Sequence, residues 1–297
     1  MANWIFFVII AQMIWGSCSV FDKFVISKGH LKNPLSYIFF NGAMNFLVFL
    51  IIPFISLEIL SLRDILIALS YGIGLNIAVS LYYKAVQYDE ISRIRMMELA
   101  TPFLVMLTSF FILGEILSKS QLISFSLFVA AGLVVSYHNN SKGKFISKAL
   151  LLILAAGVVG SFTAIASKHI YSSYGFWSAF LWLRLGQFSS MAVLFIKPVR
   201  KELKSFIFEN KVSRLMGVKM LVDFSAFIII GFAIQKGPIT LISAANTTIS
   251  PLVTFTLATL ITIFSPSLIR EEIGRKSMSI KLFAAALAIV GVLFALG

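Results

Sequence analysis

The sequence predicts an all-α membrane protein that crosses the bilayer many times. Of the 297 residues, 59% are hydrophobic and 12% are charged, which leaves too little polar surface to cover a soluble globule. The mean hydropathy of +0.96 agrees with this. Apolar runs of about 20 residues, enough to cross ~30 Å of hydrocarbon, recur along the chain. They lack the period-two alternation of membrane strands, so helices are predicted.

The apolar runs place ten membrane-spanning helices, five in each half of the chain. They cover residues 4–25, 34–57, 65–83, 94–113, 122–137, 149–171, 176–196, 212–234, 239–264 and 278–296. A polar linker at residues 139–148 separates a first repeat (1–138) from a second repeat (149–297). The first span lacks a basic leader, so we expect it to be retained in the protein.

The two halves resemble each other in order and in detail. AIQKGPITLI in the second half matches AVQYDEISRI in the first, and Ser250–Pro251 matches Thr101–Pro102. WGS at Trp15–Ser17 corresponds to VGS at Val159–Ser161. Because five is an odd number, the second copy must enter the membrane from the opposite side. The sequence therefore predicts two inverted five-helix repeats with a binding site near the midplane between them.

Loop charge predicts the orientation in the membrane. The net charge is +13, and most lysines and arginines follow the first, third, fifth, seventh and ninth spans. Anionic lipid headgroups explain this excess better than nucleic acid does, and the positive-inside rule places these basic loops in the cytoplasm and both termini outside. The segment 197–214 is expected to form an amphipathic helix on the anionic leaflet. The inner membrane of the cell is the expected location.

Several kinds of chemistry find no support in the sequence. The single cysteine, Cys18, excludes an intramolecular disulfide, and no Cys or His cluster has metal-ligand spacing. No phosphate-binding glycine loop or nucleophile elbow occurs, so we expect neither a cofactor nor ATP-driven activity. His30, His138 and His169 are scattered singly, which argues against an enzyme acting on lipids.

Ionisable residues inside spans are costly in hydrocarbon and are the first functional candidates. Arg95 and Glu98 lie one turn apart at the start of the fourth span. Glu98 is predicted to be a protonatable coupling group and Arg95 an anchor for a substrate carboxylate or phosphate, although the two could simply pair near the headgroups. Asp223 in the eighth span is the second coupling candidate; an i,i+4 ion pair with Lys219 is the favoured alternative.

Polar residues before two intramembrane prolines, Pro102 and Pro251, point to the binding site. In the ninth span, Asn246, Thr247 and Ser250 are predicted substrate contacts, with helix packing as the alternative. Each proline is expected to weaken its helix locally, so that the helix can bend there during transport.

Three further residues are candidate substrate contacts, and a fourth residue, Arg184, has a different predicted role. Trp15 is deep enough in the first span to stack on a substrate, and Asn76 and Tyr83 lie in the third span. Arg184, in the middle of the seventh span, is expected to be structural or gating because it cannot reach the interface easily.

These motifs together resemble the EamA-type drug/metabolite transporters. The resemblance rests on the Trp-Gly pair, the alanine-rich start of the fourth span, Pro102, Gly114–Glu115 and Ala130–Gly132. The second half contributes Arg184, Pro251, Glu271–Glu272 and Ile289–Gly291. The chain departs from the family at Asn41, where an arginine is usual, and many relatives keep their termini inside.

The resemblance implies a ten-helix inverted-repeat transporter that exports amino acids, metabolites or drugs by exchange or proton coupling. It also implies a central cavity lined by spans 1, 3, 4, 6, 8 and 9. We therefore expect a secondary transporter of a small amino-acid-like or drug-like metabolite, as monomer or homodimer, with protons and anionic lipids as further partners. The alternatives are a flippase for a lipid-linked sugar or phosphate, an integral-membrane enzyme on lipid substrates, and a membrane protein that transports nothing.

Overall fold

The computed structural model describes residues 4–27, 30–31, 33–86, 88, 97–136, 148–209, 212–265 and 275–296, and these residues form helices and no strands. The first-half helices are α1 (Trp4–Ser27), α2 (Pro34–Ala43), the 3-10 segments η1 (Met44–Leu50) and η2 (Ile52–Phe54), α3 (Leu62–Val86), α5 (Ala100–Leu113) and α6 (Lys119–Ser136). The second-half helices are α7 (Lys148–Ser173), α8 (Phe176–Gln187), the 3-10 segment η3 (Phe188–Phe195), α9 (Lys197–Glu209), α10 (Val212–Lys236), α11 (Ile239–Phe264) and α12 (Arg275–Leu296).

The helices are those of a polytopic membrane protein, as predicted. Six stretches of the described chain are long and apolar enough to cross a membrane: Trp4–Asp22, Leu62–Tyr82, Lys148–Ser173, Phe176–Phe195, Val212–Lys236 and Ile239–Phe264. Shorter apolar helices occupy Ile38–Phe54, Ala100–Leu113, Lys119–Val134 and Leu282–Ala295. Each coincides with a predicted span, while the count of ten crossings itself stays a prediction.

The outer surface of the bundle is apolar, as a lipid-facing surface must be. On α5 the exposed side chains include Phe103, Leu107 and Phe111, which recur every four residues along one face. The opposite face of α5 buries Val105 and Ser109 against other helices. A helix in a soluble protein shows the reverse pattern, with its polar face outward.

The second helix of each half changes from α to 3-10 winding after a similar length. Asn45 follows the end of α2, and its amide donates to the carbonyls of Asn41 and Gly42. Ser189 and Ser190 follow the end of α8, and their hydroxyls donate to the carbonyls of the preceding turn. Side chains that compete for backbone carbonyls in this way favour a locally tighter winding. The sequence pattern alone predicted uninterrupted helices here.

The two intramembrane prolines lie differently within their helices. Pro102 lies in the first turn of α5, and the helical winding is interrupted at Leu99. Because proline has no backbone N–H, it cannot donate to the carbonyl of Glu98 four residues earlier. Pro251 lies inside α11, which continues through it to Phe264.

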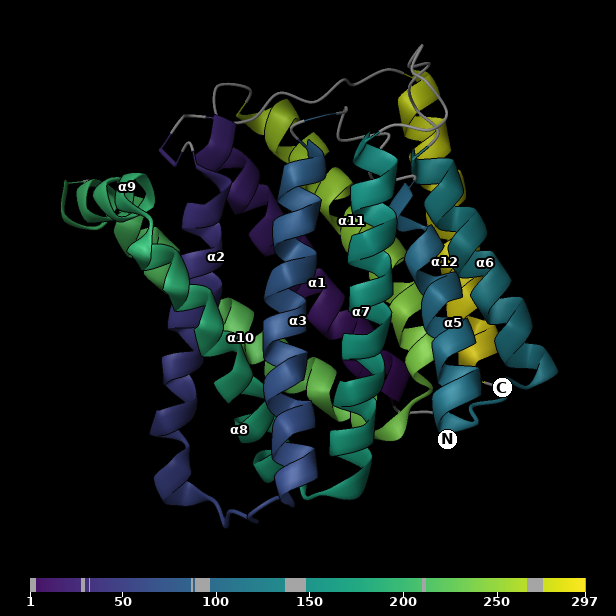
Figure 1. Ribbon diagram of the computed structural model, residues 1–297. Helices are drawn as coiled ribbons and strands as arrows, with labels where there is room; N and C mark the ends of the chain where they lie inside the picture. The colour runs from purple at the N-terminus through teal and green to yellow at the C-terminus, as the bar shows by residue number, and fades with distance from the viewer. Residues whose placement is uncertain are drawn as a thin grey trace.

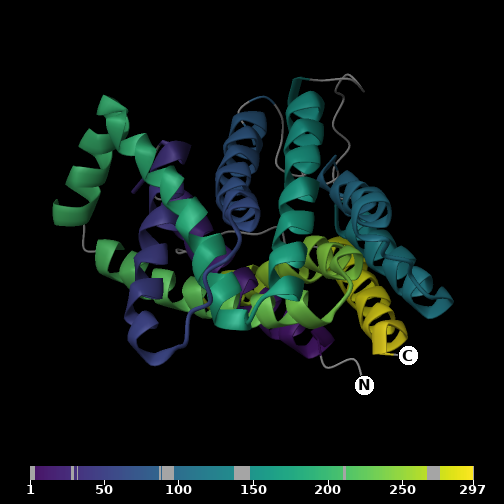
Figure 2. The same cartoon turned by 60° about the horizontal axis from the view of Figure 1, so that its bottom comes forward.

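The main helix contacts join one half of the chain to the other. α1 packs on α10 and α11, while α7 packs on α3 and α5, and α6 pairs with α12 at one side of the bundle (Figures 1 and 2). α1 begins at the end of the bundle where the termini lie, and α7 begins at the opposite end (Figure 1). At Gly16 of the WGS motif, a Cβ would lie 2.6 Å from that of Val253, so glycine lets α1 approach α11 closely.

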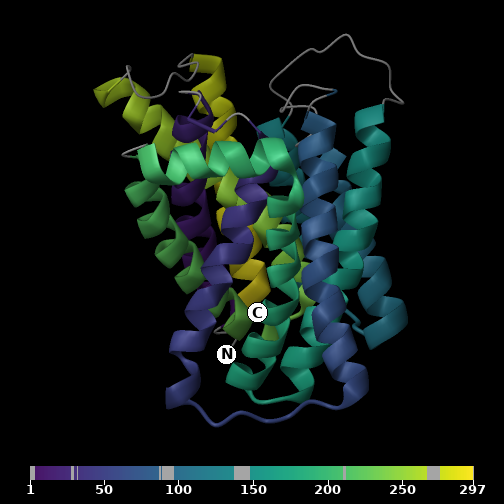
Figure 3. The same cartoon turned by 60° about the vertical axis from the view of Figure 1, so that its left-hand side comes forward.

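The helix α9 lies across the ends of its neighbours rather than along them (Figure 3). Its residues Val199, Leu203 and Phe206, spaced one and two turns apart, are buried against Phe40 and Met216. Its lysines and arginine are exposed. The helix predicted in this segment is therefore present, and its apolar face packs on the protein itself.

The turn between α10 and α11 is capped by one charge from α7 and one from the loop between α5 and α6. The ammonium group of Lys168 on α7 donates to the carbonyls of Ile234 and Gly237, at 2.8 Å each, at the end of α10. The carboxylate of Glu115 accepts from the backbone N–H groups of Ile239 and Thr240, at 3.1 and 3.2 Å, at the start of α11. Each charge has the sign that stabilises its helix end. The Gly114–Glu115 motif thus acts structurally here.

Candidate functional site

A partly open cavity of about 440 Å³ lies between helices of the two halves. Its volume is within the range of roughly 300–1,000 Å³ that small-molecule sites occupy. The described lining residues are Trp15, Cys18, Ser19, Asp22, Asn41, Ala78, Val79, Tyr82, Glu98, Thr101, Ile153, Ala156, Gly157, Gly160, Lys219, Asp223 and Phe227.

The lining residues extend from about the middle of the helices toward the end of the bundle where α1 and α3 end. On α1 and α3, which end there, the lining comes from residues 15–22 and 78–82. On α7 and α10, which begin there, it comes from residues 153–160 and 219–227. The cavity is therefore displaced from the centre of the bundle toward one of its ends.

One lysine joins two carboxylates from different helices in the cavity wall. Lys219 Nζ lies 2.9 Å from Asp223 Oδ2, one turn away on α10, and 3.1 Å from Asp22 Oδ1 on α1. The side chains of Lys219 and Asp223 are 13% and 11% exposed, whereas Asp22 keeps 29%. We call these three residues the charged triad. Within the described chain, Asp22 Oδ1 accepts no hydrogen bond, so this contact is an ion pair only.

Aromatic side chains form another part of the cavity wall. The rings of Trp15 and Phe227 meet edge to face, with centroids 5.0 Å apart, and Tyr82 faces the same space. On the Phe227 ring lies the guanidinium of Arg184, 4.3 Å from the ring centroid. Arg184 itself is not a lining residue of the cavity.

The structure brings three of the predicted site residues to the cavity: Trp15, Glu98 and Asp223. Glu98 lies directly before the break at Leu99, so its side chain enters the cavity where the helix is interrupted. Arg95 and the side chain of Tyr83 lie outside the described residues, and the predicted Arg95–Glu98 contact falls there too.

Asn76 and Arg184 are held in the packing between α3 and α8. The amide of Asn76 donates to the carbonyl of Gln187 at 3.2 Å and to the hydroxyl of Ser189 at 3.0 Å. Arg184 is 2% exposed and donates to Tyr71 Oη and Gln187 Oε1, both at 2.9 Å. These contacts join the two halves of the chain. Neither residue lines the cavity.

The polar residues of α11 are occupied within the helix packing. Asn246 accepts a hydrogen bond from the buried Gln12 of α1. The hydroxyl of Thr247 donates to carbonyls one turn earlier, and the carbonyl of Ser250 accepts from Thr254 at 2.9 Å. None of the predicted contacts Asn246, Thr247 and Ser250 lines the cavity.

Sequence reasoning missed two parts of the site. Asp22 was not singled out, and Lys219 was considered only as a partner for Asp223. The signal was present in the spacing, because residues 15, 18, 19 and 22 share one face of a helix. That face also carries Trp15, which was identified as a deep aromatic residue.

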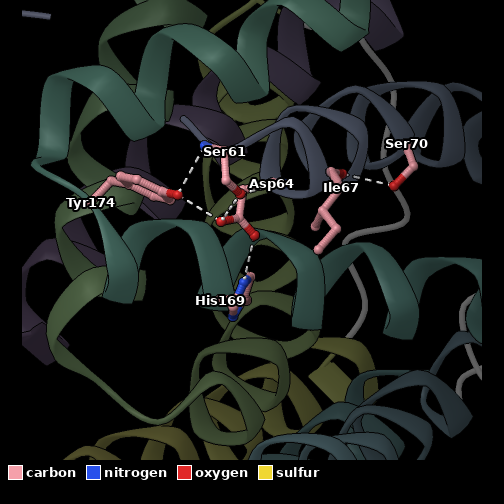
Figure 4. Close-up of polar contacts among 6 residues, drawn as sticks. All are labelled: Ser61, Asp64, Ile67, Ser70, His169 and Tyr174. Carbon is pink, nitrogen blue, oxygen red and sulfur yellow. Dashed lines mark hydrogen bonds and ion pairs between the residues drawn. The ribbon is translucent and has the colours of Figure 1, made fainter. Parts of the chain in front are cut away.

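A second polar cluster lies at the opposite end of the bundle, where α3 begins and α7 ends, and Figure 4 shows its side chains. Asp64, in the first turn of α3, accepts hydrogen bonds from Tyr174 at 2.6 Å and Ser61 at 2.7 Å. Its other oxygen lies 3.0 Å from Nε2 of His169 on α7. Ser61 is bonded to Asp64 and not to His169, so this is not the arrangement of a nucleophile and its base. The cluster joins the two halves where α3 begins and α7 ends.

Comparison with known proteins agrees with this architecture. Residues 2–137 match the model of the EamA-like transporter family. A crystal structure of another protein covers 99% of this chain and 98% of its own, with a TM-score of 0.67 and 16% identity, which shows the fold alone. No curated protein matches the sequence. Residues 2–137 are therefore similar to the EamA-like transporter family, and the fold is shared with a solved structure along the whole chain.

Proposed function

We propose that this membrane transporter of small solutes is a secondary active exporter or exchanger of an amino-acid-like or drug-like metabolite, coupled to protons. The observation that carries the proposal is the 440 Å³ cavity between the halves, with carboxylates inside a membrane-spanning bundle. Ionisable groups are retained at such depth where they bind ions or substrates.

Alternating access between the two repeats is the proposed mechanism. The cavity lies toward the end of the bundle where α1 and α3 end, while the Asp64 cluster and the capped α10–α11 turn lie at the other end. The reciprocal packing of α1 on α10 and α11, and of α7 on α3 and α5, is what two inverted repeats would produce. Closing the cavity end and releasing the Asp64 cluster would then expose the cavity to the opposite side.

Glu98 is the proposed coupling group and Asp223 the second, because both carboxylates face the cavity. A carboxylate that carries a proton in one half of the cycle and none in the other links the proton gradient to substrate movement. The break at Leu99 places Glu98 where a small rotation of the helix would change its exposure.

Replacing Glu98 with glutamine is expected to abolish transport driven by a pH gradient while counterflow exchange continues. The reason is that glutamine keeps the size and the hydrogen bonds of the side chain but cannot gain or lose a proton. The measurement is substrate flux in proteoliposomes with and without a gradient. Glu58→Gln, at an exposed carboxylate of the far end, is the matched control. An unchanged pH dependence in Glu98→Gln would exclude Glu98 as the coupling group.

A further inference from the structure

The charged triad has one more negative than positive charge. Lys219 lies within ion-pair distance of both Asp22 and Asp223, but a single ammonium group can neutralise only one carboxylate. An uncompensated charge at a mostly buried site inside a membrane protein is costly. The second carboxylate therefore needs a proton or another cation.

The cavity offers that cation a site with an apolar wall. The rings of Trp15, Tyr82 and Phe227 line the same space as the triad, and aromatic faces attract organic cations. A metal ion is a poorer fit, because no group of three His, Cys, Asp or Glu side chains in the described chain is arranged to hold one. The side chain of Asp22 lines the cavity and is 29% exposed, so an ammonium group in the cavity can approach its carboxylate.

We propose that the charged triad binds the ammonium group of an organic cation in exchange for one proton, an inference that rests on the proposed transport function. The proton leaves one carboxylate as the ammonium group arrives, so the triad becomes one unit more negative and the bound cation restores the net charge of the site. Substrate and proton thereby compete for one site. This makes the transported metabolite an amine.

Other charged and titratable groups near the triad come from several helices. They are Cys18 on α1, Tyr82 on α3 and Glu98 before α5, with Arg184 contacting Phe227 from outside the lining. Glu98 adds a further carboxylate to the wall. The Arg184 guanidinium is held by Tyr71, Gln187 and the Phe227 ring, which leaves Lys219 as the cation that lines the described cavity.

The test compares three probes that share a phenethyl group and differ in charge, on the purified protein in detergent. Phenethylamine is cationic, 2-phenylethanol neutral and 3-phenylpropionate anionic. Calorimetry in two buffers of different ionisation enthalpy counts the protons released on binding. We expect phenethylamine alone to bind, with release of up to about one proton and an affinity that falls up to tenfold per unit of decreasing pH.

Two variants test whether the probe binds to the triad or to another part of the cavity. Asp223→Asn leaves a neutral Asp22–Lys219 pair, so it should fold and yet lose at least about tenfold in phenethylamine affinity together with the proton release. Glu58→Gln should bind as the unaltered protein does.

Preferential binding of the neutral or anionic probe, no binding of any probe, or unchanged binding by Asp223→Asn would overturn the inference. If proteoliposomes move a neutral or anionic compound, the inference about the amine is overturned, but the proposed transport function is supported. Proteoliposomes that move no soluble compound would instead contradict the proposed function.

Discussion

Replacing Lys219 with methionine is expected to destabilise the protein by about 3–5 kcal/mol, the effect typical of removing one partner from a buried ion pair. The variant leaves Asp22 and Asp223 facing each other across the cavity wall without a cation. Because Asp22 is 29% exposed, solvent screening favours the lower end of that range. Thermal unfolding in detergent measures the effect.

The pH dependence of this variant identifies the cause. Protonated carboxylates do not repel each other, so the loss of stability should shrink as the pH is lowered from 8 to 5. The triple variant Asp22→Asn, Lys219→Met, Asp223→Asn removes all three charges and should recover most of the stability. Lys204→Met, at an exposed lysine of α9, is the control. Equal melting temperatures for Lys219→Met and Lys204→Met would mean that the triad does not stabilise the fold.

The second large effect is expected from Gly72→Ala on α3. A Cβ at Gly72 would lie 2.1 Å from the carbonyl carbon of Gly186 and 2.2 Å from the backbone nitrogen of Gln187 on α8. Those atoms are backbone, so a side-chain rotation cannot relieve the clash and the two helices must separate. Overpacking of this kind costs about 1–3 kcal/mol. The same separation would disturb the contacts of Asn76 and Arg184 between α3 and α8.

Gly217→Ala is the matched control for this change. Gly217 is also helical and has no atom within 4 Å of a built Cβ, so alanine there should stabilise the protein by up to about 1 kcal/mol through helix propensity. Opposite shifts in melting temperature are expected for the two variants. A Gly72→Ala protein as stable as Gly217→Ala would show that the α3–α8 approach is not closely packed in the membrane.

The helical fold was predictable from the sequence because hydrocarbon leaves few choices. A run of apolar residues must satisfy its backbone hydrogen bonds internally, so its length and composition define a helix. The 3-10 segments after Ala43 and Gln187 were not predictable in this way. They depend on whether Asn45, Ser189 and Ser190 bond to backbone carbonyls, which hydropathy does not record.

Residues of the candidate site could be predicted only where a single residue stands out from its neighbours in the sequence. Asp223 and Glu98 are charges beside or within apolar runs, and Trp15 is a large aromatic residue in the first span, so all three were identified. Asp22 was not, because its importance comes from Lys219, which lies nearly 200 residues later in the chain on a different helix.

For the same reason, several residues that were predicted to contact the substrate bond to neighbouring helices in the structure. Asn246 meets Gln12, and Asn76 meets the end of α8, in both cases across the two halves. A polar side chain within a span can face the cavity or a neighbouring helix, and periodicity does not distinguish the two. The repeat pattern therefore indicated the right region of α11 as polar without indicating which way its side chains point.

Transport by the reconstituted protein tests the central claim most directly. Proteoliposomes are given a pooled metabolite extract with and without a pH gradient, and mass spectrometry follows each compound. We expect one class of small solute to move in a gradient-dependent way, and Asp223→Asn to lose that dependence. If a folded protein moves no soluble compound under either condition, the cavity does not carry a soluble metabolite, and a lipid-linked substrate becomes the better explanation.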